Sequence, residues 1–146
     1  MSKNLIIGID AGTSVIKSVA FDLTGRQIAV ASVPNRYTTA EDGSATQPLD
    51  QTWNDCVRSL RQLAEAVPNL AHRVTAVAVT GQGDGTWLID KDHQPVGDAW
   101  LWLDARAGHT AEKLRQSSND DARFLRTGTG LNACQQGAQF VHMMQH

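Results

Sequence analysis

The sequence lacks the features that would place it at once among nucleic-acid-binding, membrane or secreted proteins. Its 13 lysines and arginines are balanced by 15 aspartates and glutamates, so a formal net charge of −2 leaves no basic surface for nucleic-acid phosphates. No apolar run approaches the roughly 18 residues of a membrane span. The apolar stretch before Asp10 is too short for a secretory signal. We therefore expect neither nucleic acid nor membrane as a partner, and the 146 residues suit one domain.

Cysteine is scarce, and the familiar nucleotide and hydrolase motifs are missing. Cys56 and Cys134 form no Cys-x-x-Cys pair, so a cytoplasmic location fits better than a secreted disulfide scaffold. The sequence has no Gly-x-x-x-x-Gly-Lys loop and no Gly-x-Ser-x-Gly elbow. Residues 128–133 match Gly-x-Gly-x-x-Ala, but they follow a charged helical stretch instead of a strand, so we expect no dinucleotide site. His142 and His146 have a metal-compatible spacing without an evident third ligand, and we interpret them as a surface pair.

The hydrophobic pattern predicts an α/β domain with a mixed sheet. Residues 5–9, 17–22 and 27–33 predict a three-stranded antiparallel meander, and a polar loop follows over 34–48. A helix is expected over 50–67, with a buried stripe of Trp53, Cys56, Val57, Leu60, Leu63, Ala64 and Val67. Further along we expect a strand over 74–80, a hairpin of strands over 86–90 and 99–103, and helices over 107–116, over 122–126 and from near Cys134 onward.

The most distinctive stretch is the turn between the first two predicted strands. Asp10 ends an apolar strand, Gly12, Thr13 and Ser14 follow, and Lys17 lies in the next strand. Such a tight hairpin can present backbone N–H groups and hydroxyls to a phosphate. The Asp10 carboxylate could hold a hydrated Mg²⁺ beside that phosphate, and the Lys17 ammonium could reach the same side. The alternative is a plain Asp-x-Gly turn with a solvated lysine.

A second candidate site is the sequence Gly-Gln-Gly-Asp-Gly at residues 81–85. Its three glycines allow the backbone to approach a small polar ligand closely. Asp84 can accept hydrogen bonds from two vicinal hydroxyls, as suits a polyol. Asp104 and Arg106, at the end of a later predicted strand, would lie nearby. The alternative is a glycine-rich strand end with a local Asp–Arg pair.

Four motifs in order carry a family resemblance. They are the Asp-x-Gly-Thr-x-x-x-Lys turn, the loop at 81–85, the Trp-Leu-Trp-Leu-Asp-Ala-Arg stretch at 100–106, and a Thr-Gly loop at 127–128 that runs into Gln-Gly-Ala-Gln at 136–139. Together they resemble the N-terminal domain of the FGGY carbohydrate kinases, within the actin-like, ribonuclease-H-like ATPase superfamily. The resemblance covers essentially the whole chain, and the loop at 81–85 looks most like that of erythritol-type polyol kinases, with pentulose kinases also similar.

The resemblance implies a fold with the meander, then parallel strands, and helices on both faces of the sheet. It implies an ATP-dependent kinase that transfers the γ-phosphate to a sugar or polyol hydroxyl, and it leaves room for a homo-oligomer of the full-length enzyme. The implied roles are Mg²⁺ binding through water by Asp10, phosphate binding by Gly12, Thr13, Ser14 and Lys17, and substrate binding by Gln82, Gly83, Asp84, Asp104, Asn132 and Gln135. Gln82 could instead clamp the backbone. The family's general base is an aspartate of a second domain, which also holds the adenosine pocket.

The sequence departs from the family pattern at the expected substrate site. Gly83 and Asp84 stand where relatives carry Met-His or Arg-Glu, and residues 132–136 replace an aromatic residue that many relatives have before the last helix. These changes imply a pocket that is lined by smaller side chains and by more amide groups.

Residues 138–146 form a helical pattern that ends without a stop or cap signal. We interpret the chain as an N-terminal kinase domain, truncated at its C-terminal end and inactive alone because the ATP-binding domain is absent. Two alternatives remain at this point. One is a non-catalytic sugar- or nucleotide-binding module, or an actin-like assembly protein, of the same fold. The other is a small hydrolase that uses the hairpin alone, for which the nearby carboxylates offer no evident base.

Overall fold

The computed structural model describes residues 3–146, which divide into two compact units. The first unit contains the described residues up to Tyr37 together with Asp50–Gln82, and the second contains Thr38–Leu49 and Gly83–His146. Within the described residues, no helix combines the length and the apolar character needed to cross a membrane.

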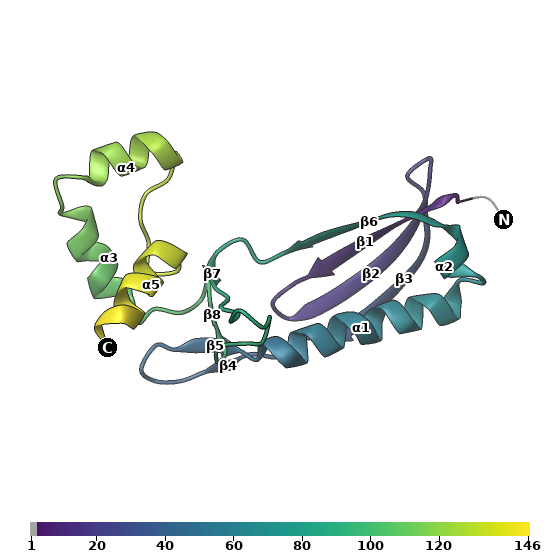
Figure 1. Cartoon of the computed structure of the whole chain (residues 1–146), viewed down its shortest axis with the longest axis horizontal. Helices are drawn as coiled ribbons and strands as arrows, with labels where there is room; N and C mark the ends of the chain where they lie inside the picture. The colour runs from purple at the N-terminus through teal and green to yellow at the C-terminus, as the bar shows by residue number, and fades with distance from the viewer. Residues whose placement is uncertain (1–2) are drawn as a thin grey trace. The chain divides into compact units, whose positions relative to one another are not determined.

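A four-stranded mixed sheet forms the first unit (Figure 1). Its strands are β1 (Leu5–Ala11), β2 (Val15–Asp22), β3 (Gln27–Pro34) and β6 (Val74–Gly81), in the order β3-β2-β1-β6. β2 pairs antiparallel with both β1 and β3, whereas β6 pairs parallel with β1. A parallel partner requires a crossover connection, and the helices α1 (Leu49–Ala66) and α2 (Leu70–Arg73) lie in it. The predicted strands and the mixed character of the sheet are therefore confirmed.

One face of this sheet packs against α1 and α2. The core comprises Leu5, Ile7, Ile9, Ala20, Ala31, Leu63, Val67 and Leu70, with Cys56 and Leu60 packed against it. Much of the predicted stripe of α1 is thus confirmed, but the prediction was wrong for Trp53, which is 70% exposed, and for Ala64, which is also exposed. Two polar residues, Asp55 and Ser59, are buried on the helix instead. The Ser59 hydroxyl lies 2.7 Å from that of Ser18 in β2, and this hydrogen bond offsets the cost of burying both groups.

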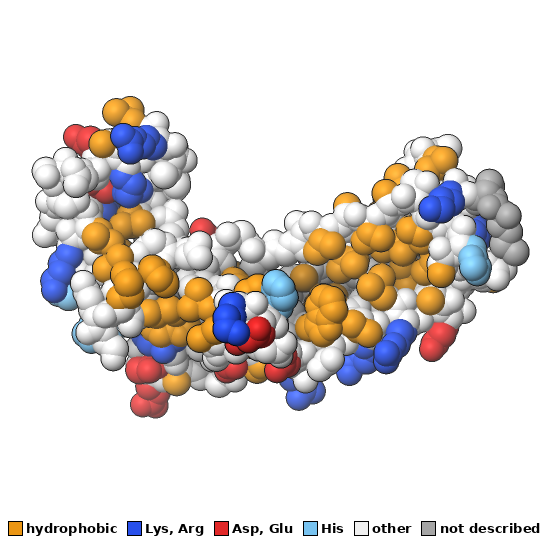
Figure 2. All heavy atoms as spheres, viewed as in Figure 1, with side chains coloured by type: hydrophobic (Ala, Val, Ile, Leu, Met, Phe, Trp, Pro, Cys, Tyr) orange, Lys and Arg blue, Asp and Glu red, His pale blue; other side chains and the backbone are white. Residues whose placement is uncertain are grey.

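Within the first unit as described, α1 and α2 pack against one face of the sheet, and the expectation of helices on both faces stays a prediction. Alternate residues of β1 face the helix, and the opposite face carries Gly8 and Asp10 in an open pocket. On β6, Val77 and Val79 pair with the core residues Ile7 and Ile9, so they lie on the helix-facing side of the sheet, yet they remain 54% and 70% exposed. β6 is also the one strand of this sheet that runs parallel to its neighbour, within residues 3–146. Figure 2 shows hydrophobic side chains exposed over the first unit.

The second unit combines a small antiparallel sheet with three helices. The sheet has the order β4-β5-β8-β7, with β4 (Thr38–Thr39), β5 (Ala45–Gln47), β8 (Ala99–Leu101) and β7 (Gly85–Thr86). The helices are α3 (Gly108–Arg115), α4 (Asp120–Thr127) and α5 (Gln136–Gln145). A core of Ala107, Ala111, Leu131 and Ala138 connects the loop before α3, α3 itself, the segment before α5 and α5.

Two predictions for this unit were wrong in detail. The segment 34–48 was expected to be a loop, but it contains β4 and β5, which are too short for an alternating pattern to reveal. The strand expected over 86–90 shrinks to β7, because Asp90 closes a local turn. The Asp90 carboxylate accepts hydrogen bonds from the backbone N–H groups of Asp92 and Gln94, at 2.8 and 2.9 Å.

Candidate functional site

The turn between β1 and β2 is built so tightly that it requires glycine. A Cβ atom at Gly12 would lie 2.8 Å from the backbone carbonyl oxygen of Val15. Gly12 and Thr13 are half-buried, whereas Ser14 is exposed. The structure thus confirms the tight hairpin that the sequence predicted, with the hydroxyl residues at its tip. Their binding of phosphate stays a prediction.

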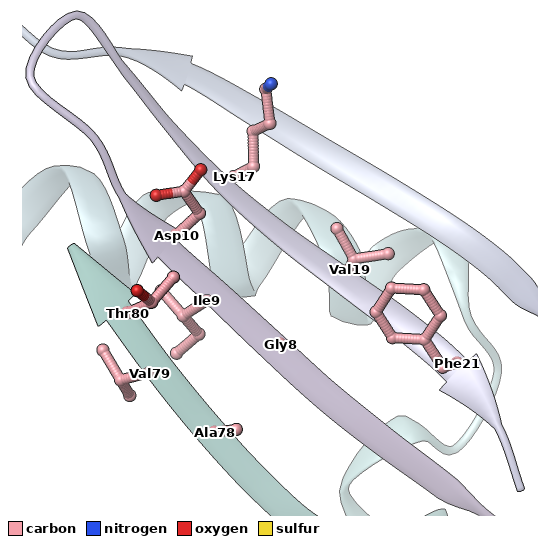
Figure 3. A pocket seen from close by; sticks show the side chains of 9 residues that line it. All are labelled: Gly8, Ile9, Asp10, Lys17, Val19, Phe21, Ala78, Val79 and Thr80. Carbon is pink, nitrogen blue, oxygen red and sulfur yellow. The ribbon is translucent and has the colours of Figure 1, made fainter. Parts of the chain in front are cut away.

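Asp10, Lys17 and Thr80 form a polar row across three adjacent strands. In the register of the sheet, Asp10 lies opposite Lys17 of β2 on one side and Thr80 of β6 on the other. Residues opposite one another on neighbouring strands point to the same face. Figure 3 shows the Asp10 and Lys17 side chains on the same face of β1 and β2. The row therefore brings together a carboxylate, an ammonium group and a hydroxyl.

An open pocket of about 330 Å³ lies along this row. Besides the polar row, its lining is mostly apolar and comprises Gly8, Ile9, Val19, Phe21, Ala78 and Val79 (Figure 3). The pocket lies entirely within the first unit. The polar end of the pocket suits a charged group of a ligand, and its apolar lining suits an uncharged part of the ligand.

The donor set at Asp10 fits Mg²⁺ held mainly by water. Asp10 is exposed, and within the described residues it takes part in no ion pair, although Lys17 lies opposite. The same part of the chain contains no group of three or more histidine, cysteine, aspartate or glutamate residues that could hold a metal by themselves. Mg²⁺ commonly keeps several waters and binds through one or two carboxylates together with substrate phosphates. A single exposed carboxylate beside a tight glycine turn is compatible with that preference.

In the second unit, the loop before β7 is fixed by Gly85. This residue has a φ of +104°, and a Cβ atom there would lie 2.5 Å from the carbonyl oxygen of Trp100 in β8. The Gly85 N–H donates to the carbonyl oxygen of Cys134 at 2.9 Å. These contacts hold the exposed Asp84 next to the segment that precedes α5.

Cys134 lies beside Asp84, although sequence reasoning did not single it out as a site residue. Its Sγ is 3.8 Å from the Asp84 Oδ2. Burial raises the pKa of the Cys134 thiol, and the Asp84 carboxylate raises this pKa further because it disfavours a neighbouring thiolate. The two residues are 50 positions apart, so no local signal in the sequence could have paired them.

This arrangement predicts that the Cys134 thiol is alkylated slowly, because the Asp84 carboxylate disfavours its thiolate. In the variant Asp84→Asn, Cys134 is expected to react with iodoacetamide several times faster at pH 8, because its pKa falls when the neighbouring negative charge is removed. Peptide mass spectrometry would measure the rate. Cys56, whose raised pKa has burial and Asp55 as its causes, serves as an internal control. Equal Cys134 rates in both proteins would contradict the assignment.

The structure places Asp104 in a buried network of hydrogen bonds, and its expected contact with substrate stays a prediction. This residue is 1% exposed. Its Oδ2 accepts a hydrogen bond from the Ala45 backbone N–H at 2.8 Å and from the Arg106 guanidinium at 2.7 Å. Its Oδ1 accepts from the Arg106 backbone N–H at 3.1 Å. Both oxygens are therefore engaged within the chain, and the guanidinium that Asp104 holds lies 3.4 Å from the centre of the Trp100 ring.

The remaining expected substrate residues lie in different settings. Gln82 is half-buried at the end of the first unit, and Gly83 is exposed, with no atom within 4 Å of the position that a Cβ would take there. The Gln135 side chain is used inside its own loop, because its Oε1 accepts from the Asn132 N–H at 3.1 Å and its Nε2 donates to Thr129 at 3.3 Å. Asn132 is exposed. Asp84 is therefore the acid of this group that is both exposed and held in place.

His142 and His146, which the sequence indicates as a surface pair, contact each other and a neighbouring helix. The rings of His142 and His146 lie 4.5 Å apart, and the His142 Nδ1 is 3.1 Å from the Thr110 hydroxyl. Burial lowers the pKa of His142, with further lowering by His146 and Arg106. No third ligand joins the pair in the described chain, so the geometry provides no metal site there.

Comparison with known proteins gives one consistent family. Residues 5–146 match the FGGY family of carbohydrate kinases, N-terminal domain. An erythritol kinase of Brucella abortus (strain 2308) is 61% identical over 140 residues, which cover 96% of this chain and 27% of that protein. A glycerol kinase of Alcanivorax borkumensis is 29% identical over 127 residues, which cover 86% of this chain and 25% of that protein.

A solved structure shows the same fold. The crystal structure of xylulose kinase from Rhodospirillum rubrum superposes with a TM-score of 0.89 at 25% identity, over 97% of this chain and 30% of the other. The chain thus spans about a quarter of the length of the curated relatives named above.

Proposed function

The chain belongs to the FGGY family of carbohydrate kinases, N-terminal domain, and from this premise we propose that it serves an ATP-dependent kinase that phosphorylates a sugar or polyol. The observation that carries the proposal is the polar row of Asp10, Lys17 and Thr80 beside the glycine turn. Phosphoryl transfer depends mainly on positioning and on neutralising phosphate charge. This part of the first unit supplies N–H and hydroxyl groups that can position a phosphate, and charged groups that can neutralise it directly or through a metal ion.

Each residue of the hairpin has a proposed task. Gly12, Thr13 and Ser14 contact the β- and γ-phosphates of ATP through N–H and hydroxyl groups, and the Lys17 ammonium balances their negative charge. Asp10 holds Mg²⁺ through water, and the bound ion would neutralise charge on the phosphate oxygens. The tight turn supports this assignment because the missing side chain at Gly12 lets the turn close against the Val15 carbonyl, which keeps the N–H and hydroxyl groups of the turn close together.

Asp84 is the proposed acceptor for the substrate hydroxyls. It is exposed, it lies in a glycine-rich loop, and the Gly85 hydrogen bond to Cys134 holds that loop. A carboxylate can accept hydrogen bonds from two vicinal hydroxyl groups at once. Gln82, Gly83 and Asn132 stay proposed neighbours, whereas Asp104 and Gln135 are better explained as supports of the local structure. The name of the erythritol kinase relative favours a four-carbon polyol as the substrate.

We further propose that the general base and the adenosine pocket lie in a second domain of a longer polypeptide. Support comes from the length of the relatives, of which this chain spans about a quarter. An enzyme that consumes ATP and carries two free thiols would work in the reducing cytoplasm.

The proposal is tested by ATP-dependent phosphorylation of a polyol panel with the full-length protein and its Asp84→Ala variant. We expect the KM for the polyol to rise by about tenfold or more, because at least one charge-assisted hydrogen bond is lost. Asp98→Ala is the matched control, since Asp98 is an exposed aspartate of the same unit. Unchanged kinetics in Asp84→Ala would remove this residue from the site. Polyol binding without any turnover by the full-length protein would favour a non-catalytic binding module.

A further inference from the structure

Asn35, the residue after β3, makes three polar contacts in the first unit. Its side-chain Nδ2 donates to the Gly12 carbonyl oxygen at 2.9 Å, and its backbone N–H donates to the Ser14 carbonyl oxygen at 2.9 Å. Its Oδ1 accepts a hydrogen bond from the Thr52 hydroxyl of α1 at 3.4 Å. Asn35 is only 4% exposed. A buried amide is thus aimed at the turn that the proposed function assigns to phosphate.

The two bonds to the turn fix the orientation of its peptide groups. A trans peptide is planar, and its C=O and N–H point in opposite directions. When Asn35 holds the Gly12 carbonyl, it also fixes the plane that carries the Thr13 N–H, which is turned away from Asn35. The bond to the Ser14 carbonyl fixes the next part of the turn in the same way. A hairpin tip without such bonds would sample several conformations and would have to be ordered by its ligand.

We infer that Asn35 is a positioning residue that holds the β1–β2 turn in the conformation that receives phosphate. The inference rests on the proposed function of the hairpin. Asn35 acts through the Gly12 and Ser14 carbonyls, and it needs no contact with the ligand itself. Sequence reasoning missed it because Asn35 lies 23 positions from Gly12, within a segment that reads as a polar loop.

The contact with Thr52 allows positioning to be separated from general structural support. Asn35→Ala removes the bond to Gly12 and the bond from Thr52 together. Thr52→Val removes the hydroxyl that donates to Asn35 and leaves both bonds to the turn in place. Asn35→Asp keeps the side-chain volume and loses the donor, so it replaces the alanine variant if that variant does not fold. Asn54→Ala, at an exposed position of α1, controls for loss of an asparagine.

The test uses nuclear magnetic resonance on the full-length protein, which would carry the proposed adenosine pocket, with amide hydrogen exchange and a titration with Mg-ATP. In Asn35→Ala we expect exchange at residues 12–15 to speed up by about tenfold, and the Kd for Mg-ATP to rise by about tenfold, as for one lost hydrogen bond. Thr52→Val and Asn54→Ala are expected to keep both values within about twofold of the wild type. In Asn35→Asp we expect the faster exchange as well.

Two results would overturn the inference. One is an unchanged exchange rate and Kd in Asn35→Ala while Mg-ATP still shifts the wild-type amides of Gly12, Thr13 and Ser14. The other is an equal effect of Thr52→Val, which would make Asn35 a structural residue only. If Mg-ATP shifts none of these amides in the wild type, the proposed function of the hairpin fails first and the inference fails with it. That outcome differs from the other two because it appears before any substitution is made.

Discussion

Replacing Asp10 by asparagine is expected to lower kcat for phosphoryl transfer in the full-length protein by about a hundredfold or more. The reason is electrostatic, since a neutral amide no longer balances the charge of the cation that the site is proposed to hold beside the phosphates. Asparagine has nearly the same shape as aspartate, so the hairpin keeps its geometry. Steady-state kinetics with Mg-ATP and a polyol would measure the effect.

The stability of the Asp10→Asn variant provides the necessary control. Within residues 3–146, Asp10 forms no ion pair, so the free energy of unfolding is expected to change by no more than about 0.5 kcal/mol. The KM for the polyol is also expected to stay near the wild-type value, because the proposed acceptor of the substrate hydroxyls is Asp84. A full kcat in this variant would exclude Asp10 from the reaction. A large loss of stability would point to a structural role.

Replacing Gly85 by alanine is expected to destabilise the second unit by about 3–5 kcal/mol, through a strained backbone and a steric clash together. Gly85 has a φ of +104°, and a Cβ atom would lie 2.5 Å from the Trp100 carbonyl oxygen. Relief of that clash requires β7 to move from β8, where Gly85 pairs with Leu101. The movement would also break the hydrogen bond from Gly85 to Cys134. Chemical denaturation followed by circular dichroism would measure the loss.

Alanine substitutions at two other glycines of the same unit distinguish the cost of backbone strain from the cost of the steric clash at Gly85. Gly97 has a φ of +76° but open space around a Cβ atom, so Gly97→Ala is expected to cost about 1 kcal/mol from the backbone alone. Gly83 has neither a positive φ nor a close neighbour, so Gly83→Ala should change the free energy of unfolding by less than about 0.5 kcal/mol. Equal losses in all three variants would refute this reading of the loop before β7.

The first unit was predicted well because its signals are local. An apolar run that ends at Asp10, a glycine turn and a second apolar run specify a hairpin within about twenty residues. The register then places Asp10 opposite Lys17, as the alternation of residues along the two strands requires. The second unit was predicted less well. β7 and β8 contain only two and three residues, so their pairing depends on tertiary contacts more than on pattern.

The candidate site shows the same division between local sequence signals and tertiary contacts. Asp84 could be proposed from its glycine-rich loop, but its neighbour Cys134 is 50 positions away. Asp104 resembled a substrate ligand in the sequence, yet the backbone N–H of Ala45, 59 positions earlier, accounts for one of its bonds. Sequence patterns do not show which acid will be buried, because burial depends on segments that meet only after folding.

The sequence by itself determined the strands of the first sheet, the glycine turn beside Asp10 and the family to which the chain belongs. These features follow from hydrophobic periodicity and turn chemistry, which act between residues close in the chain. Only the tertiary structure decided that Asp104 is a buried support, that Cys134 adjoins Asp84 and that Asn35 holds the Gly12 carbonyl. Each of these depends on a hydrogen bond or contact between distant segments, and packing of the whole unit selects which distant groups meet.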